Sequence, residues 1–507
     1  MKILLDTNII IHREANKASR PEIGLLFKWI DNLKYSKYIH PITIEELNRF
    51  KDSEAKETMN IKVENYNQIK YLAPFNEKIS HVSAELDKDL NDQNDTKILN
   101  EIYENRIDAL ISEDKKIHRK AELLSIKEKV FTIQKFLEKV TSENPDLVPY
   151  SILAVKQVDF GQVDLSDPFF DSFKEDYSEF EWWFNKKSEN PCYICKSDDI
   201  LSAFLFIKVE DKGEDYSNIS PAFKPKKRLK IGTLKVTGNG YKIGERFLKI
   251  VFDNAFQYKV DEIYVTVFDK RQEQIQLIEM LEEWGFAYHG IKSTSNGEEK
   301  VYIKPFSKKN PIYIENPRIS YPFFSKETNK YIIKIEPQYH TELFPDSINT
   351  KEDKSLYQEN QPHRNRIGKV YISHSPQRDL IKAGDIFLVY RIGESDPKIY
   401  SSTITSICIV ENIKNDFKDF EDFFNSCNRR TLINREDLLN NWWNKKKNYK
   451  PFIINFLYAF SLPTPKPTFK NLIDAKVFEN PSSLGVGFYK MDDEQFKKIV
   501  KFAYGIK

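Results

Sequence analysis

Short apolar runs alternate with stretches of helical spacing over the first 145 residues of the chain. Ile3–Leu5 and Ala109–Ile111 are continuous apolar runs with the character of buried strands. The apolar residues between Ile23 and Leu33 recur at the spacing of one face of a helix. Because parallel strands need a crossover connection, usually a helix, this alternation predicts a parallel sheet covered by helices.

A chain of 507 residues exceeds what one hydrophobic core supports, which stops growing at about 250–300 residues. After residue 145 the pattern changes to aromatic-rich segments and then to strands and two long helices. Prolines gather in Ser307–Pro317, which is typical of a linker, and strand-like runs resume at Tyr331. We therefore expect a multidomain α/β protein divided as follows: a parallel α/β domain over 1–145, a second α/β domain over 146–306, a linker over 307–330 and a strand-rich domain over 331–507.

The composition excludes some classes of protein. Hydrophobic residues make up 40% and aromatic residues 13%, so the chain is not disordered, and a net charge of +2 excludes a uniformly basic nucleic-acid coat. No signal peptide and no membrane-spanning run are recognisable, and four cysteines are too few for a disulfide framework, so we expect a cytoplasmic protein without a membrane partner. Cys192 and Cys195 form a single C-x-x-C pair, which supplies only half of a structural zinc site or is an ordinary pair in a strand or turn.

Acidic residues follow the predicted strands of the first domain. Asp6 comes directly after the first strand, Asp114 follows the strand Ala109–Ile111, and Asp95 begins a predicted helix. These positions share the carboxyl edge of a parallel sheet, where α/β proteins bind ligands, and Glu46 adds a fourth carboxylate. Crowded carboxylates repel one another and suit Mg²⁺ or Mn²⁺, which can activate water for phosphodiester cleavage.

Each acid also has a structural explanation when it is taken alone. Asp95 is a suitable N-cap, Thr43–Glu46 fits a capping box, and Asp114 suits a turn. Asp6 has no such role unless Thr7 or Asn8 opens a helix. The combination of four acids is what favours a metal site.

Four segments resemble the motifs of PIN domains: Leu4–Asn8, Ile42–Leu47, Asn94–Leu99 and Leu110–Asp114. The resemblance implies an endoribonuclease whose metal ligands and catalytic residues are Asp6, Glu46, Asp95 and Asp114. It also implies that Asn8 and Ser112 organise these acids. Glu45 is an alternative to Glu46, and Glu113 is an alternative to Asp114, as the acid of its motif. A haloacid-dehalogenase reading of Asp6 is disfavoured because Asn8 stands where that family has a second aspartate.

A glycine-bearing loop, Thr237–Gly244, lies between the predicted strand Leu229–Val236 and a predicted helix. Its backbone N–H groups and the positive end of the helix suit a phosphate, although a plain turn that needs glycine remains an alternative. The dinucleotide fingerprint G-x-G-x-x-G is not met, because the spacing from Gly240 to Gly244 is one residue too long, and a Rossmann cofactor is therefore not expected.

This region resembles GNAT acetyltransferases in the segments Lys230–Val236, Ile243–Gly244 and Leu277–Phe286. The resemblance implies acetyl-CoA as cofactor and an acetyl acceptor in a protein or tRNA. The cofactor-binding residues that it implies are Leu234, Val236, Asn239, Gly240, Lys242, Ile243 and Gly244. Three positions depart from the family: Lys242 replaces a glycine, Gln274 a helix asparagine and Leu281 a tyrosine. Since leucine cannot donate a proton, either another group serves or the domain binds without rapid transfer.

The C-terminal part resembles PUA-like domains of the ASCH and EVE type at Ala383–Tyr390 and Ser401–Val410, which implies a small β-barrel with flanking helices that binds RNA. Aromatic and cationic residues interleave nearby, as on a surface that binds single-stranded nucleic acid: Trp442, Trp443, Lys445, Lys446 and Lys447. The alternative is a helix end with buried tryptophans and solvated lysines. A second basic run, Lys224–Lys230, suits either a nucleic acid or a solvated loop.

The leading hypothesis from the sequence is a metal-dependent endoribonuclease fused to an acetyltransferase-like domain and an RNA-binding domain, with a toxin-like or RNA-regulatory role. One alternative is an acetyltransferase whose other domains only recruit RNA or metal. A second is a regulatory scaffold without catalysis.

Overall fold

The structure, a computed structural model, describes all residues except 15–20, 50–58, 60–61, 144–154, 198–199, 238–242, 348–365, 395–396, 428–430, 432, 447–448, 464, 481 and 507. The chain divides into two compact units, Met1–Pro149 and Tyr150–Lys507. Among the helices of the described residues, none has the length and apolar character needed to cross a membrane.

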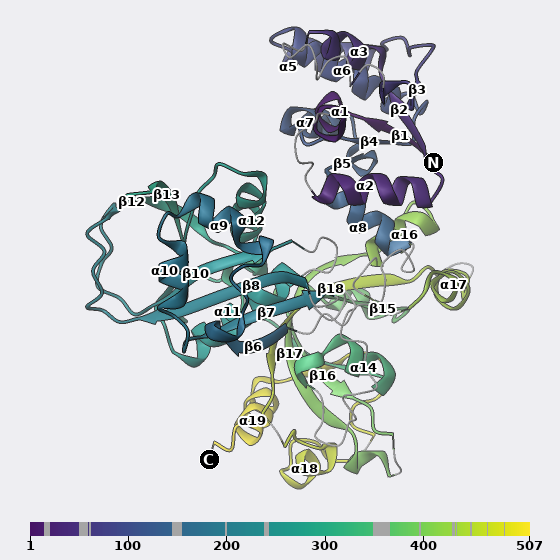
Figure 1. Cartoon of the computed structure of the whole chain (residues 1–507). Helices are drawn as coiled ribbons and strands as arrows, with labels where there is room; N and C mark the ends of the chain where they lie inside the picture. Colours follow the sequence, from purple (N-terminus) through teal and green to yellow (C-terminus); the bar gives the residue numbers. More distant parts are fainter. Residues whose placement is uncertain are drawn as a thin grey trace. The chain divides into compact units, whose positions relative to one another are not determined.

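The first unit contains a five-stranded sheet in the order β3-β2-β1-β4-β5, in which all neighbours pair in parallel (Figure 1). The strands are β1 (Lys2–Leu5), β2 (Ser36–Ile39), β3 (Asn67–Gln68), β4 (Ala109–Ile111) and β5 (Val130–Phe131). The helices are α1 (Thr7–Glu14), α2 (Pro21–Asn32), α3 (Pro41–Asn48), α5 (Glu77–Leu86), α6 (Leu90–Tyr103), α7 (Lys115–Leu123) and α8 (Ile133–Glu143). The predicted parallel sheet is confirmed.

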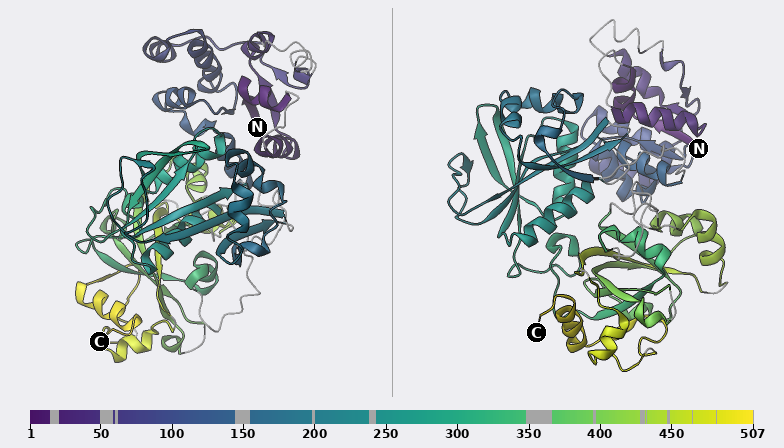
Figure 2. Two further views of the ribbon diagram at one scale, coloured as in Figure 1. Left: turned by 60° about the vertical axis from the view of Figure 1, so that its left-hand side comes forward. Right: turned by 60° about the horizontal axis from the view of Figure 1, so that its bottom comes forward.

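Helices cover both faces of this sheet (Figures 1 and 2). Side chains alternate along a strand, so Ile3 and Leu5 join one core with α2 and α8, whereas Leu4 joins another with α5, α6 and α7. Both cores are buried, which explains why β1 and β4 read as continuous apolar runs rather than as alternating ones.

The second unit begins with an eight-stranded mixed sheet in the order β6-β7-β8-β10-β11-β13-β12-β9. Its strands are β6 (Val155–Asp159), β7 (Pro191–Ser197), β8 (Ile200–Glu210), β9 (Ile219–Ser220), β10 (Arg228–Val236), β11 (Glu262–Val267), β12 (Ala287–Thr294) and β13 (Gly297–Pro305). Its helices are α9 (Asp171–Asp176), α10 (Phe180–Asn185), α11 (Ile243–Gln257) and α12 (Gln272–Glu283). The two long helices predicted from apolar spacing are α11 and α12.

A third, six-stranded sheet follows in the order β15-β18-β17-β16-β14-β19. Its strands are β14 (Lys330–Ile335), β15 (Gly368–Ser373), β16 (Ile386–Arg391), β17 (Thr403–Lys414), β18 (Phe452–Ser461) and β19 (Tyr489–Met491). The helices of this part are α13 (Pro317–Ser320), α14 (Pro337–Leu343), α16 (Phe420–Cys427), α17 (Arg435–Asp437), α18 (Phe469–Asp474) and α19 (Asp493–Ala503). Within the described residues no ladder joins the outer strands β15 and β19, so the sheet is open and the predicted closed barrel is not observed.

The segment predicted as a linker packs into the second unit. Its helix α13 is followed by Tyr321, which is fully buried and donates a hydrogen bond from Oη to the carbonyl oxygen of Tyr458 on β18, at 2.6 Å. The Tyr321 ring also contacts Phe252 of α11 at 5.2 Å. The second and third sheets thus share one core, and the division of the chain into three domains stays a prediction.

Gly285 ends α12 with φ +81°, a conformation that favours glycine. A Cβ atom there would lie 2.8 Å from the Cα of Ile319, which is backbone and cannot move aside cheaply. We expect Gly285→Ala to lower the free energy of unfolding of the second unit by about 2–4 kcal/mol. Gly213→Ala is the control, because open space surrounds Gly213. Urea unfolding measures both variants, and equal midpoints for them would contradict the prediction.

Candidate functional site

The carboxyl edge of the first sheet brings the predicted acids together. The strand order reverses at β1, which has β2 on one side and β4 on the other, and open α/β sheets bind ligands outside such a point. Asp6 follows β1 directly, and Asp114 follows β4 and caps α7 through its side chain, which accepts a hydrogen bond from the Lys116 backbone N–H at 2.6 Å. Glu46 lies on α3 after β2, and Asp95 lies on α6.

The acids influence one another electrostatically. Asp6 is 4% exposed, and burial raises its pKa to about 6, with Asp114 and Glu46 adding to the rise. A hydrogen bond from Ser112 Oγ to Asp6 Oδ2, at 2.7 Å, opposes this shift. Burial, together with the charges of Asp114 and Asp6, raises the pKa of Asp95 to about 7. The four side chains therefore lie within electrostatic reach of one another.

Some of the structural roles considered for these residues are present and two are wrong. Thr43–Glu46 is not a capping box, because α3 begins at Pro41 and is capped by His40, whose Nδ1 accepts from the Ile42 backbone N–H at 3.1 Å. Asp95 is not the N-cap of its helix, because α6 begins earlier, at Leu90, and Asp89 caps it by accepting from the Asp92 backbone N–H at 2.9 Å. Glu113 accepts a hydrogen bond from the backbone N–H of Ile133, at 2.7 Å, at the start of α8.

The supporting polar residues differ in their surroundings. Asn94 donates a hydrogen bond from Nδ2 to Glu46 Oε1 at 3.2 Å, a contact that the sequence motif did not predict. Ser112 is buried and contacts Asp6, as predicted for a residue that organises the acids. Asn8, by contrast, is exposed on α1, and Glu45 is exposed on α3.

A metal ion would suit the chemistry of these donors, since carboxylates are hard oxygen ligands and a divalent cation would relieve their mutual repulsion. In the part of the chain that the structure describes, however, no group of three His, Cys, Asp or Glu side chains stands arranged to hold an ion. The metal roles of Asp6, Glu46, Asp95 and Asp114 therefore stay a prediction.

A second candidate site lies where β10 and β11 separate. The two strands pair in parallel only from Arg228 with Glu262 to Ile231 with Val265, although β10 continues to Val236. The later residues of β10 still pair with β8, after a register shift between Ile231 and Thr233. Within the described residues, the edge of β10 that faces β11 is thus free of a partner strand over its last residues, and α11 begins shortly after β10 ends.

The residues predicted to bind the cofactor fall around this opening. Leu234 and Val236 lie on β10, half-buried against the core, while Ile243 and Gly244 begin α11. A Cβ atom on Gly244 would lie 2.9 Å from Sδ of Met280, so glycine allows α11 to approach α12. Asn239, Gly240 and Lys242 lie outside the described residues.

Two departures from the GNAT pattern have structural explanations. Leu281 is fully buried in the core, so it packs rather than facing a ligand. Gln274 caps α12: its Oε1 accepts from the backbone N–H groups of Lys270 and Arg271, both at 3.0 Å, and its Nε2 donates to Asp176 Oδ2 at 2.8 Å.

Two lysines of β10 were not recognised from the sequence. Lys235 donates from Nζ to the carbonyl oxygen of Phe169, at 2.5 Å, and to Ser172 Oγ, at 2.7 Å, which ties the α9 segment to the end of β10. Lys230 pairs with Tyr264 just before the strands separate, and its Nζ lies 5.7 Å from the Tyr264 ring centre. Burial lowers the pKa of Lys230, and the charge of Lys292 lowers it further. No local motif marks either residue, because both roles depend on strand pairing.

The C-x-x-C pair is not arranged as a metal site. Cys192 and Cys195 are both buried on β7, but they belong to different hydrophobic clusters. Burial raises the pKa of the Cys192 thiol to about 12 and that of Cys195 to about 11, which opposes formation of the thiolates that bind zinc. The alternative of an ordinary strand pair describes them.

The predicted RNA-binding patch is partly a packed cluster. Trp443 stacks on Phe423 with ring centres 5.5 Å apart, and Trp442 stacks on His374 at 5.6 Å. Lys445 and Lys446 are exposed, whereas Lys447 lies outside the described residues. Both tryptophans are half-buried against aromatic neighbours, which is closer to the alternative of a packed helix end than to a free stacking surface.

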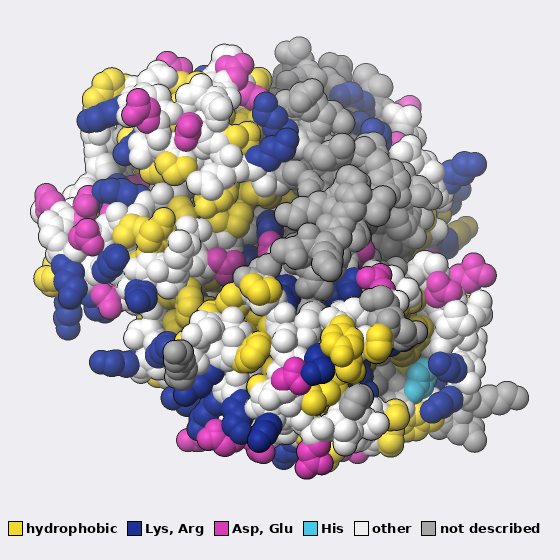
Figure 3. All heavy atoms as spheres, turned by 90° about the horizontal axis from the view of Figure 1, so that it is seen from below, with side chains coloured by type: hydrophobic (Ala, Val, Ile, Leu, Met, Phe, Trp, Pro, Cys, Tyr) yellow, Lys and Arg dark blue, Asp and Glu magenta, His cyan; other side chains and the backbone are white. Residues whose placement is uncertain are grey.

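The basic run Lys224–Lys230 is structural at its centre. Arg228 is buried and its Nε donates to Glu262 Oε2 at 3.0 Å. On the face drawn in Figure 3, lysine and arginine side chains are interspersed with acidic ones.

The sequence matches no model of a known protein family, and a search of curated proteins finds no match either. Among solved structures, the chain is similar to a mutant ASCH protein from Zymomonas mobilis, with 11% identity over 34% of this chain and 95% of that chain and a TM-score of 0.23. It is similar to Naa50 of Arabidopsis thaliana in complex with a bisubstrate analogue, with 18% identity over 31% of this chain and 99% of that chain and a TM-score of 0.20. It is also similar to N-acetylglutamate synthase from Neisseria gonorrhoeae, with 9% identity over 60% of this chain and 95% of that chain and a TM-score of 0.22.

The charge of Asp95 should make the first unit less stable as the pH rises. Its pKa is about 7 in the fold against 3.8 for the ordinary carboxyl, so the folded state keeps a proton that the unfolded state loses, and the free energy of unfolding falls between about pH 4 and pH 7. We expect Asp95→Asn to raise the unfolding temperature of this unit by a few degrees at pH 8 in EDTA and to flatten its pH dependence. Thermal unfolding measures this. Asp31→Asn, at an exposed carboxyl beside Lys37, is the control, and an equal response of the two variants would sink the prediction.

Proposed function

We propose that the second unit binds acetyl-CoA and transfers the acetyl group to an amine. The observation that carries this proposal is the separation of β10 from β11 next to the start of α11. A free strand edge offers backbone N–H and C=O groups to the amides of the pantetheine arm, and the first turn of a helix offers N–H groups to phosphates.

The chain's own residues supply binding and proton transfer in this proposal. Acetyl-CoA, when bound, provides an acetyl group activated as a thioester. The first turn of α11, from Ile243, binds the phosphates through backbone N–H groups. We assign to Lys230 Nζ, in its neutral amine form, the uptake of the proton that the acceptor ammonium must lose before the nitrogen can attack; burial lowers the pKa of Lys230, which favours that form. The identity of the acceptor, a protein or tRNA amine, stays a prediction.

Coenzyme A should bind the full-length protein at one saturable site, and a negative charge at the start of α11 should oppose it. Gly244→Asp places a carboxylate there, and the flexible Met280 side chain can move away from the new Cβ atom. We expect at least a tenfold loss of affinity by calorimetric titration, because the carboxylate repels the phosphates. Gly213→Asp adds the same charge in open space and should leave affinity unchanged. Absence of binding by the wild type would refute the proposed function.

A second candidate is metal-dependent RNA cleavage by the first unit. The charges of Asp114 and Glu46 contribute to the raised pKa values of Asp6 and Asp95 at the switch point of the parallel sheet, which is the electrostatic setting that a divalent cation relieves. A bound Mg²⁺ or Mn²⁺ would lower the pKa of water and stabilise charge on a phosphate.

Purified protein should cleave single-stranded RNA with Mn²⁺, and Asp6→Asn should reduce the rate at least a hundredfold because one carboxylate is lost from the cluster. Asn keeps an oxygen that can accept the Ser112 hydrogen bond, so the fold should persist. Asp31→Asn serves as the control. Cleavage that EDTA does not stop, or that survives in Asp6→Asn, would contradict the assignment.

A further inference from the structure

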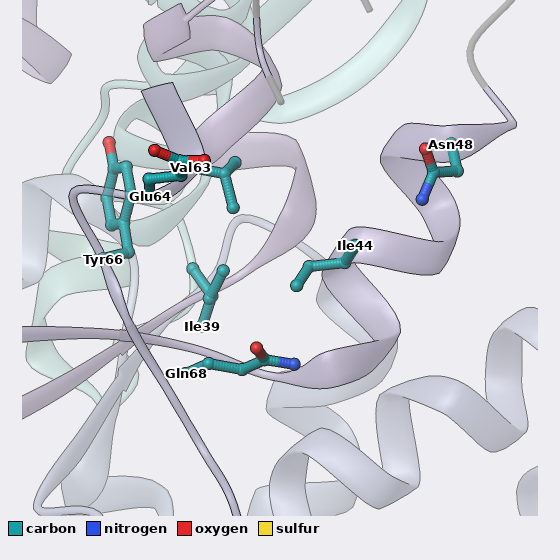
Figure 4. A pocket seen from close by; sticks show the side chains of 7 residues that line it. All are labelled: Ile39, Ile44, Asn48, Val63, Glu64, Tyr66 and Gln68. Carbon is teal, nitrogen blue, oxygen red and sulfur yellow. The ribbon is translucent and has the colours of Figure 1, made fainter. Parts of the chain in front are cut away.

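A pocket of about 300 Å³ opens in the first unit, beside α3 (Figure 4). Its walls come from the end of β2, from α3, from the turn before β3 and from β3 itself. The lining residues are Ile39, Ile44, Asn48, Val63, Glu64, Tyr66 and Gln68. This volume is at the lower end of the range of small-molecule sites, and none of the lining residues belongs to the acidic cluster.

The lining divides into an apolar part and a polar part. Ile39, Val63 and Ile44 present aliphatic surface, and the ring of Tyr66 borders one side (Figure 4). Tyr66 meets the buried Phe27 edge-to-face, with ring centres 6.2 Å apart, so the tyrosine is fixed in place before any ligand arrives. A flat ring would find both aromatic and aliphatic contacts here.

The polar part selects among flat rings. Asn48 and Gln68 carry amides, which both donate and accept hydrogen bonds, and Glu64 carries a carboxylate, which accepts only. The charged side chain of this lining is negative, so an anionic group is disfavoured inside the pocket. A saturated chain offers no hydrogen bond to the exposed Gln68 amide or to the Glu64 carboxylate, which makes an aliphatic ligand unfavourable.

The ligand chemistry that suits the Glu64 carboxylate, the Gln68 amide and the Tyr66 ring together is a neutral aromatic ring with an amino group on its edge. Carboxylates accept from the amino group of cytosine, and amides pair with the edge of adenine, whereas uracil offers carbonyl oxygens where cytosine and adenine offer amines. We propose that this pocket binds a nucleobase that carries an exocyclic amino group, with the sugar and phosphate left outside. The proposal depends neither on acetyl transfer by the second unit nor on a metal ion.

The position of the pocket fits a polynucleotide as well as a free nucleotide. Ile44 and Asn48 are four residues apart and share one face of α3, whereas Glu46, halfway between them, lies on another face of the helix. The pocket and the acidic cluster thus adjoin the same short helix. Single-stranded RNA is commonly recognised through unstacked bases that lie on aromatic side chains and hydrogen-bond along their edges, and the lining of this pocket contains side chains of both kinds.

The test is a ligand-observed NMR titration of the full-length protein with CMP and UMP, which are equal in charge and nearly equal in size. We expect CMP to bind at least fivefold more tightly than UMP. Glu64→Gln should bring the two affinities to within about twofold, because the amide no longer offers acceptors alone. Tyr66→Leu should weaken CMP at least fivefold. Glu85→Gln, on the exposed face of α5, is the matched control and should change neither affinity.

Equal binding of CMP and UMP by the wild type, absence of binding by both, or an unchanged CMP preference in Glu64→Gln would each overturn the proposal. Glu64 is exposed, so this variant keeps its fold even if Tyr66→Leu does not. Pentacytidylate and pentauridylate distinguish the source of the base: a preference for cytidine that is larger in the pentamers assigns the pocket to an RNA strand, and an equal preference assigns it to a free nucleotide. Coenzyme A titrations report on the second unit separately.

Discussion

Pairing between β10 and β11 stops at Ile231 and Val265. The candidate site of the second unit lies at the point where these two strands separate. A strand edge inside a sheet normally satisfies its backbone groups on both sides, so an edge left free beside a helix start is costly unless something binds there. Gly232 lies at the register shift, where a Cβ atom would press on the Phe206 ring. The glycine therefore permits the bend, and the opening is a property of the strand rather than of a mobile loop.

The helix that begins at this opening is held from two sides. Its inner face joins the core of the eight-stranded sheet, and its outer face meets the C-terminal sheet, where Lys249 Nζ lies 5.0 Å from the ring centre of Tyr458 on β18. Arg246 donates two hydrogen bonds to Asp346, at 2.5 and 2.7 Å, next to the first turn. The C-terminal sheet thus supports the element that would hold the phosphates, and it does not act only as a tethered recruitment module.

The sequence predicted those features that depend on local spacing and on the geometry of parallel strands. Apolar periodicity located α11 and α12, and the rule that parallel strands end at one edge brought Asp6 near Asp114. Features that depend on long-range packing escaped prediction, such as the contact between Lys235 and Phe169 or the burial of Tyr321 in a segment that reads as a linker. A proline-rich composition indicates that a segment contains little regular structure. It does not indicate whether the side chains of that segment pack into a neighbouring core.

The acidic cluster contains one residue that structure alone does not explain. Asp6 accepts a hydrogen bond from Ser112, Glu46 accepts one from Asn94, and Asp114 caps α7, so each of these carboxylates has a partner. Asp95 accepts no hydrogen bond from the described residues, and burial and three like charges, those of Asp114, Asp6 and Glu46, oppose its ionisation. Lys120, which already pairs with the buried Asp87 at 2.7 Å, relieves Asp95 only in part. Of the four acids, Asp95 is thus the one whose predicted role as a metal ligand has no competing structural role among the described residues, and that role stays a prediction.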